Sequence, residues 1–110
     1  MDQVLLVMTS MPDEGSAHDL ASLLVDAGLA ACVHILPGMQ SVYRWDGVLH
    51  TTSEVTVQIK TVQSCYAEVE QAVLQSHPYD VPEIIAVPVV DGLPAYLDWV
   101  RQSTRKDRHA

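Results

Sequence analysis

A long antiparallel hairpin is the feature of this sequence that most constrains its fold. The pair Asp46-Gly47 stands between SVYRW and VLHTTSEVTVQIKT, two runs rich in β-branched and aromatic residues. An Asp-Gly pair between such runs is among the strongest short-range signals of a β-hairpin. The arms exceed the about five or six residues of a typical strand. One face of the returning arm is apolar and the other polar, because two sets of residues alternate: Val55, Val57 and Ile59 with Glu54, Thr56, Gln58 and Lys60.

The first part of the chain predicts a strand followed by a helix. Residues 3–8 form a short apolar run, as in a central strand that is buried on both faces. Pro12, near the first helical position, and Gly28, as the stop, bound a segment with apolar residues at helical spacing. The run AACVHIL then opens the outer arm of the hairpin, and Pro37-Gly38 predicts a bulge or bend in it.

The second part predicts a helix, a connecting corner, an edge strand and a final helix. The strand IIAVPVV, residues 84–90, contains Pro88, which cannot donate to a sheet ladder and therefore favours an edge position. It follows the corner HPYDVPEI, residues 77–84. The helix before the corner has apolar residues at helical spacing, namely Cys65, Val69, Ala72 and Val73. The helix over DGLPAYLDWVRQ has an apolar face of Leu93, Tyr96, Leu97 and Val100.

The predicted order of elements is strand, helix, strand, strand, helix, strand, helix. The first six match the split βαβ, or ferredoxin-like, arrangement β-α-β-β-α-β, an α+β fold in which helices cover one face of an antiparallel sheet. The 110 residues fit one domain, 1–110, and the basic C-terminal end, 101–110, is expected to be frayed. The uncovered sheet face and the long hairpin predict a homo-oligomer, because oligomers close exposed edges and apolar faces.

The charge and hydropathy of the chain exclude two classes of partner. The formal net charge is −8, and four of the six basic residues lie in the final stretch VRQSTRKDRHA. Nucleic-acid binding needs a basic surface, which the acidic body lacks, so we expect no nucleic-acid partner. No apolar run approaches the roughly 18 residues of a membrane helix, and the first residues do not resemble a signal peptide. We therefore expect no membrane partner and a cytoplasmic location.

Several motifs together resemble one known family. They are the PDE helix start, the run LAACV, the PG bend before S-x-Y-x-W-x-G, the strand from Glu54 to KT, and HPYxxPE. This combination, which extends over nearly the whole chain, is similar to the CutA family of divalent-cation tolerance proteins. The resemblance implies a ferredoxin-like subunit in a tight homotrimer whose long hairpins pair with neighbouring subunits. It also implies an architecture related to the PII signalling proteins, which bind ligands in clefts between subunits.

The resemblance also carries expectations about function. The family is named for tolerance to copper and other divalent metals, copper binding is attributed to some members, and no enzymatic reaction is established for it. We therefore expect a non-enzymatic homotrimer in divalent-metal tolerance or response. It would act either through weak direct copper binding or as a PII-like small-ligand sensor or scaffold. No cofactor is expected to be required, and Cu(II) or another divalent cation is the candidate ligand.

Histidine and cysteine are the candidate metal ligands, because imidazole and thiolate favour copper. The resemblance implies a metal role for His77, but two further positions that carry His or Cys in some relatives are Ser76 and Thr9 here. A second candidate is Cys32 with His34, since residues two apart share one face of a strand. The alternative for this pair is that Cys32 packs in the core while His34 faces water or a neighbour.

The corner HPYDVPEI is open to two interpretations. His77, Tyr79 and Glu83 could supply an acid, a base and a proton donor, so an unrecognised enzyme is an alternative function. The two prolines instead fix the backbone and favour extended conformations before them, which indicates a rigid connector at a subunit boundary. We favour the connector, since neither a nucleophile motif nor a Gly-rich phosphate loop accompanies the corner.

A ligand cleft is the third candidate site. Aromatic and charged residues of both hairpin arms can share a face. In a trimer they could meet the corner of a neighbouring subunit and form a cleft with aromatic walls. Alternatively, the aromatic residues anchor the interface between subunits. The residues of this candidate cleft or trimer interface are Tyr43, Trp45, Glu54, Lys60, Tyr79 and Glu83.

Overall fold

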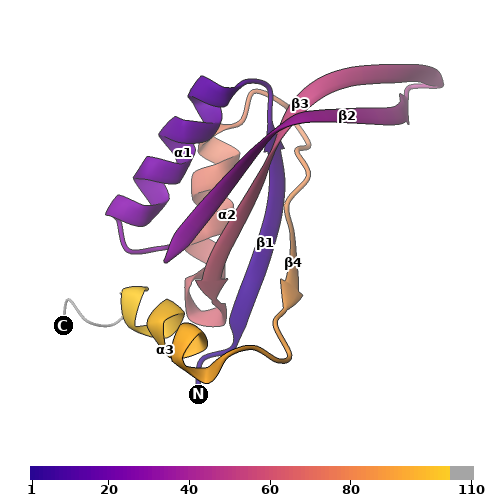
Figure 1. Ribbon diagram of the computed structural model, residues 1–110. Helices are drawn as coiled ribbons and strands as arrows, with labels where there is room; N and C mark the ends of the chain where they lie inside the picture. Colours follow the sequence, from indigo (N-terminus) through magenta and orange to yellow (C-terminus); the bar gives the residue numbers. More distant parts are fainter. Residues whose placement is uncertain (105–110) are drawn as a thin grey trace.

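The computed structural model describes residues 1–104 and contains one four-stranded antiparallel sheet with helices packed on it (Figure 1). The strand order across the sheet is β2-β3-β1-β4. This arrangement confirms the predicted ferredoxin-like α+β fold. In chain order the elements are β1 (Val4–Met11), α1 (Glu14–Asp26), β2 (Cys32–Trp45), β3 (Val48–Val62), the short 3-10 helix η1 (Gln63–Cys65), α2 (Tyr66–Ser76), β4 (Ile85–Pro88) and α3 (Pro94–Ser103).

The hairpin of β2 and β3 forms as predicted. Its last pair before the turn is Trp45↔Val48, and the turn consists of Asp46 and Gly47. Their φ angles are 51° and 77°. Positive φ at both positions is the type I′ geometry, whose twist matches that of the flanking strands and which Asp-Gly favours.

The outer half of this hairpin projects beyond the rest of the sheet. The pairing of β1 with β3 ends at Met11↔Val55, so residues 48–54 of β3 pair with β2 and not with β1. We call residues 39–54 the outer hairpin; Figure 1 shows it leaving the body at the upper right. The subunit is correspondingly elongated, with extents of 47 × 27 × 22 Å.

A bulge lies where the outer hairpin begins. Leu36 pairs with Thr56, but the next pair is Met39↔Glu54, so two residues of β2 lie opposite one of β3. These two residues are Pro37 and Gly38, where the sequence predicts a bulge or bend. Gly38 has a φ of 86°, a conformation that glycine adopts without the steric cost of a Cβ.

The apolar core lies between one face of the sheet and the helices α1 and α2, which cover that face in Figure 1. Alternate residues of β1 and β3 point into it, and the apolar stripes of the helices close it. Full burial of a Val, Leu or Ile side chain contributes about 1.5–3 kcal/mol, so this layer holds the fold together. The fully buried members include Val7, Met11, Leu20, Leu24, Val57, Ile59, Val69, Val73 and Val100.

Helix α1 begins at Glu14, two residues after Pro12, which the sequence places near the first helical position. Asp13, not Pro12, provides the cap: its backbone is extended, and its carboxylate accepts a 2.7 Å hydrogen bond from the backbone N–H of Ser16. This bond lowers the pKa of Asp13 below its ordinary value. At the other end Gly28 has a φ of 71°, which confirms it as the predicted stop.

The C-terminal elements differ from the prediction in their bounds. β4 covers only Ile85–Pro88 of the expected 84–90, and its place at the sheet edge is confirmed. Leu93 precedes α3 as its cap residue, so it is not on the helical face. Of the basic end 101–110, residues 101–103 lie within α3, and 105–110 lie outside the described residues. In the described part of the chain, no helix is long and apolar enough to cross a membrane.

The sheet face turned away from α1 and α2, which we call the open face, carries the even-numbered residues of β3. Cys32 lies opposite Lys60 on this face and is half-buried, so the expectation that it packs in the core is wrong. Glu54 belongs to the polar set of the hairpin, yet only 8% of it is exposed. Its burial is the main departure from the pattern of the sequence and leads to the candidate site.

Candidate functional site

His77 holds the corner of residues 77–84 against the sheet. It is 8% exposed, and its Nε2 lies 2.6 Å from the carbonyl oxygen of Ser10. Its Nδ1 accepts a 3.2 Å hydrogen bond from the backbone N–H of Tyr79. Because a backbone N–H only donates and a carbonyl only accepts, the ring is the neutral tautomer with its proton on Nε2. The imidazole therefore joins β1 to the corner through both of its nitrogens.

The surroundings of His77 do not fit a copper ion. A copper ligand needs a free nitrogen lone pair, and the Nδ1 lone pair already accepts the bond from Tyr79. Ser76 is exposed at the end of α2, and Thr9 is a buried hydroxyl in place of a thiol. Among residues 1–104, no three His, Cys, Asp or Glu side chains come together as a metal site.

Glu54 is the centre of a second cluster, at the root of the outer hairpin. Its Oε1 accepts a 2.6 Å hydrogen bond from the Ser41 hydroxyl, and its Oε2 accepts a 3.1 Å bond from the phenol of Tyr79. Three separate segments, β2, β3 and the corner, therefore meet on one carboxylate. We call Ser41, Tyr43, His50, Thr52, Glu54 and Tyr79 the Glu54 cluster.

The register of the hairpin brings the remaining members together. Beyond the bulge, Tyr43 lies opposite His50 and Ser41 opposite Thr52. The rings of Tyr43 and His50 stack, with centroids 5.3 Å apart and planes 16° apart. The hydroxyl of Thr52 is buried and has no hydrogen-bond partner within residues 1–104. An orphaned hydroxyl beside a buried carboxylate is an unusual combination, because buried polar groups are nearly always bonded.

Tyr79 forms the outer wall of the cluster. Its ring packs on His77 with centroids 4.7 Å apart. Partial burial raises the pKa of the Tyr79 phenol, and the hydrogen bond and negative charge of Glu54 raise the pKa further, with a smaller increase from Tyr43. The phenol therefore keeps its proton and remains a hydrogen-bond donor to Glu54.

The other residues expected in the cleft lie elsewhere in the subunit. The ammonium of Lys60 sits 5.2 Å from the ring centroid of Tyr96 on α3, and that ring packs on Trp99 at 5.6 Å. Trp45 is at the tip of the hairpin, next to the turn, and Glu83 is exposed. Of the six predicted residues, a single subunit brings together Tyr43, Glu54 and Tyr79.

The catalytic alternative is not assembled in one subunit either. The phenol of Tyr79 points to Glu54 rather than to the exposed Glu83, and both ring nitrogens of His77 are bonded. The pair Cys32 and His34 lies on the open face, opposite Lys60 and Gln58. His34 is exposed and Cys32 half-buried, so these two remain a prediction without a third ligand.

Ser41, His50 and Thr52 were not among the predicted site residues, although a signal for them exists. Counting outward from Asp46-Gly47 in a two-residue turn places each residue of one arm opposite a defined residue of the other. That count gives Tyr43 opposite His50 and Ser41 opposite Thr52. The contact of Ser41 with Glu54 then follows as a diagonal neighbour across the hairpin.

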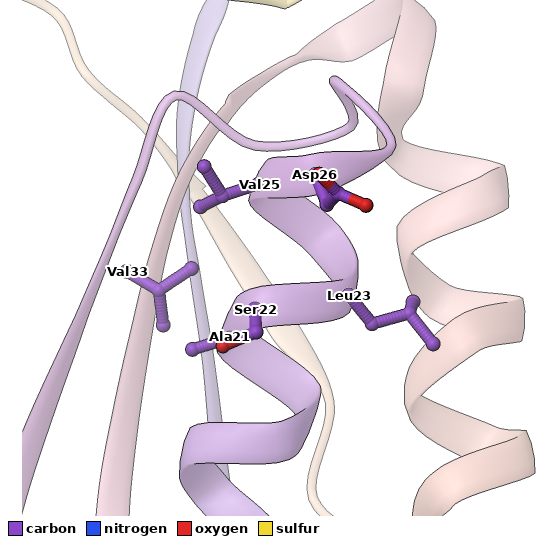
Figure 2. A pocket seen from close by; sticks show the side chains of 6 residues that line it. All are labelled: Ala21, Ser22, Leu23, Val25, Asp26 and Val33. Carbon is purple, nitrogen blue, oxygen red and sulfur yellow. The ribbon is translucent and has the colours of Figure 1, made fainter.

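A separate groove lies between α1 and the inner part of β2 and has a volume of about 540 Å³. Figure 2 shows Val25 and Val33 on one side of α1 and Leu23 on the other. Its only polar side chains are those of Ser22 and Asp26, and none of the predicted site residues contributes to it. The groove therefore lacks the convergent polar groups of a specific ligand site.

Comparison with known proteins identifies the family. The family model of the CutA1 divalent ion tolerance protein matches residues 5–103. A divalent-cation tolerance protein CutA of Thermus thermophilus is 40% identical over 104 residues, which cover 94% of this chain and 99% of that protein. The chloroplastic protein CutA of Arabidopsis thaliana is 42% identical over 101 residues, 92% of this chain but only 56% of the plant protein.

Solved structures agree with this assignment. The crystal structure of CutA1 from the psychrotrophic bacterium Shewanella sp. SIB1 superposes with a TM-score of 0.91 at 41% identity, and the match covers 94% of this chain and 96% of that one. The family model and the Thermus thermophilus relative are named for divalent-cation tolerance and not for a reaction. The chain therefore belongs to the CutA1 family of divalent ion tolerance proteins.

Proposed function

We propose that this chain acts as a homotrimer in divalent-cation tolerance, without catalysing a reaction, and that its ligand sites lie where the outer hairpin of one subunit meets the next. The observation that carries the proposal is the outer hairpin. Within residues 1–104, no third strand pairs with either of its arms. A two-stranded hairpin alone is at best marginally stable in water.

The side chains of the outer hairpin support this proposal. Val42, Trp45 and Leu49 are 64%, 55% and 63% exposed, and Tyr43 and Val48 are also exposed. Single exposed apolar residues are ordinary, but several on one projecting ribbon indicate a protein interface. Aromatic residues are enriched in such interfaces because they bury a large area at little entropic cost.

A receiving surface is available on the opposite edge of the sheet. β4 pairs with β1, and its other edge is open within the described residues. Ile85 and Val87, on the open face of this edge, are exposed. Exposed strand edges pair readily with other chains, and closed oligomers satisfy them. The outer hairpin of a second copy supplies the apolar residues and the free backbone groups that this edge needs.

Sedimentation velocity at micromolar subunit concentration tests the assembly. We expect a species of three times the subunit mass of 12.1 kDa. The double variant Val42→Lys and Leu49→Lys puts two charges on the outer hairpin and should dissociate the trimer. Leu23→Lys, at an exposed position on α1, is the matched control and should leave the trimer intact. A well-folded wild-type monomer under these conditions contradicts the proposal.

We infer that the chain supports tolerance as an assembled scaffold or sensor rather than through a copper ion at His77. The support is the hydrogen bonding of both ring nitrogens of that residue. Cells that lack the protein should regain growth in Cu(II) when they express the wild type or His34→Ala. The Val42→Lys and Leu49→Lys variant should fail to restore growth. Full rescue by this variant in its dissociated form would show that assembly is not required.

A small-ligand sensor is the second candidate, and the Glu54 cluster favours it. A buried carboxylate, two phenols and an unbonded hydroxyl lie together at the root of the outer hairpin. A few convergent polar groups of these kinds fix the orientation of a ligand in an otherwise apolar site. We expect a ligand to raise the melting temperature of the wild type. The Glu54→Gln variant should lose this increase while it remains a trimer.

A further inference from the structure

We propose that the Glu54 cluster binds a compact organic ammonium ion, which replaces the Tyr79 phenol on the carboxylate. The inference rests on the sensor role proposed above and specifies the chemical class of its ligand. It depends on the residues of one subunit, so it can be tested separately from the state of assembly.

The charge of Glu54 has no cationic partner in the described part of the chain. Its oxygens accept bonds from two hydroxyl groups. The basic side chains of residues 1–104 contact other groups: Arg44 bonds the Gly47 carbonyl, Lys60 lies over Tyr96, and Arg101 pairs with Asp98. Burial of a carboxylate is costly unless it is paired with an opposite charge. A cation is therefore the ligand that the cluster favours most strongly.

The hydrogen-bonding capacity of the cluster matches an ammonium group. A carboxylate offers about four lone-pair sites, and two of those of Glu54 are in use. The hydroxyl of Thr52, which lies opposite Ser41 in the ladder, has no hydrogen-bond partner in the described part of the chain. An ammonium has three donors and no acceptor. It can bond both Glu54 oxygens and the Thr52 oxygen, which would satisfy the orphaned hydroxyl.

Aromatic faces add a second attraction for a cation. Tyr43 is fixed by its stacking on His50, and Tyr79 by its packing on His77. Both tyrosines are partly exposed, so their rings can contact a ligand from solvent. A cation within about 6 Å of such a ring is attracted by its negative face. Two phenol rings beside one carboxylate therefore favour a cation with a short alkyl chain.

The Tyr79 phenol covers the carboxylate but is weakly held. Its distance of 3.1 Å from Oε2 is longer than the about 2.5–2.7 Å of a strong hydroxyl–carboxylate bond. Tyr79 is 42% exposed, so a small movement of its ring along His77 can free Oε2 without unfolding the corner. The ligand thus competes with one weak intramolecular bond. Loss of that bond also releases the corner from the hairpin and would transmit binding to the outer hairpin.

Two other cations fit the cluster less well. A divalent metal needs several ligating groups, and no trio of His, Cys, Asp or Glu converges in residues 1–104. A basic side chain from residues 1–104 of a second copy would have to leave its own contacts, because Arg44, Lys60 and Arg101 are engaged within each subunit. A free organic cation has no such contact to break.

Calorimetric titration with butylammonium chloride tests the proposal, with 1-butanol as the neutral isostere. We expect saturable binding of the amine and none of the alcohol. Glu54→Gln should weaken binding by about tenfold or more, since it removes the charge but keeps the shape. Tyr79→Phe should strengthen binding several-fold, because it removes the competing hydroxyl and keeps the ring. Tyr43→Leu, which leaves the carboxylate intact, should weaken binding and serves if Glu54→Gln does not fold.

The outcomes separate this inference from the proposed assembly. A trimer that binds no butylammonium contradicts the cation site alone, and a monomer that binds it contradicts the trimer alone. Equal binding of the amine and the alcohol, or weaker binding by Tyr79→Phe, overturns the proposal. Binding that emerges only in Lys60→Met also overturns it, because the site would then belong to a lysine of a neighbouring subunit. The proposal is also overturned if Mg²⁺ or Cu²⁺ binds saturably in a manner that depends on Glu54 while the amine does not bind.

Discussion

Replacement of His77 by alanine should destabilise the protein strongly. The substitution removes the bond to the Ser10 carbonyl and the bond from the Tyr79 N–H. Each such bond contributes about 0.5–1.5 kcal/mol, and a buried carbonyl left without a partner costs about 1–3 kcal/mol more. Ser10 is buried, whereas the N–H of Tyr79 lies in an exposed residue where water can replace the ring. The expected loss is therefore about 2–4 kcal/mol, most of it from Ser10.

Guanidinium unfolding at one fixed subunit concentration measures this loss, since oligomer stability depends on concentration. His77→Gln keeps a donor that can reach the Ser10 carbonyl and should lose less than His77→Ala. His34→Ala removes an exposed imidazole and should change stability by less than about 0.5 kcal/mol. Cu(II) titrations of folded wild type and His77→Ala should give the same signal. A stable His77→Ala variant that has lost a saturable, stoichiometric copper signal would refute the structural role assigned to this ring.

Three further perturbations follow from the fold. Burial and the bond to Glu54 raise the pKa of Tyr79 above its ordinary value of 10.0. The wild type should therefore be more stable than Tyr79→Phe below pH 10, and urea unfolding should show this advantage disappear as the pH rises through the raised pKa of the folded state. Gly47→Val places a β-branched residue at a φ of 77° and should cost about 1–3 kcal/mol, whereas Gly15→Ala, in ordinary contact inside α1, should gain about 0.5–1 kcal/mol. Val69→Ala should cost about 2 kcal/mol through lost burial and a cavity, while Val90→Ala, at an exposed position, should be nearly neutral in the same assay.

The sequence predicts the strands and helices well because each has a local cause. The Asp-Gly turn, the alternation in β3 and the prolines at the bulge and in β4 act within a few residues of the structure that they determine. The shifts at Pro12 and Leu93 are two positions and one position long, and composition alone does not fix the end of a helix to within one or two residues.

The candidate site is less predictable because its contacts join distant segments. The sequence pattern places Glu54 on the polar face of the hairpin. It is nevertheless buried, because Tyr79 of the corner, 25 residues later, packs over it. Lys60 lies opposite Cys32 at the inner end of β3, where its ammonium contacts Tyr96 of α3 instead of the outer hairpin. The histidine of the corner bonds a main-chain carbonyl 67 residues earlier, and no side-chain pattern in the sequence reports a backbone partner. Long-range contacts of these kinds follow from the tertiary packing and not from local propensity.

The bulge at Pro37-Gly38 has one more consequence, for the parity of β2. Before it, even-numbered residues such as Cys32 share a side with the even residues of β3; after it, odd-numbered ones such as Ser41 and Tyr43 do. The one extra residue at the bulge thus determines whether the even-numbered or the odd-numbered residues of the outer part of β2 lie on the side of Glu54. If the ladder continued from the Leu36↔Thr56 pair without a bulge, Gly38 would lie opposite Glu54, and Val42 and Arg44, instead of the hydroxyl and the phenol, would share its side. A single backbone irregularity thereby decides which chemistry surrounds the carboxylate.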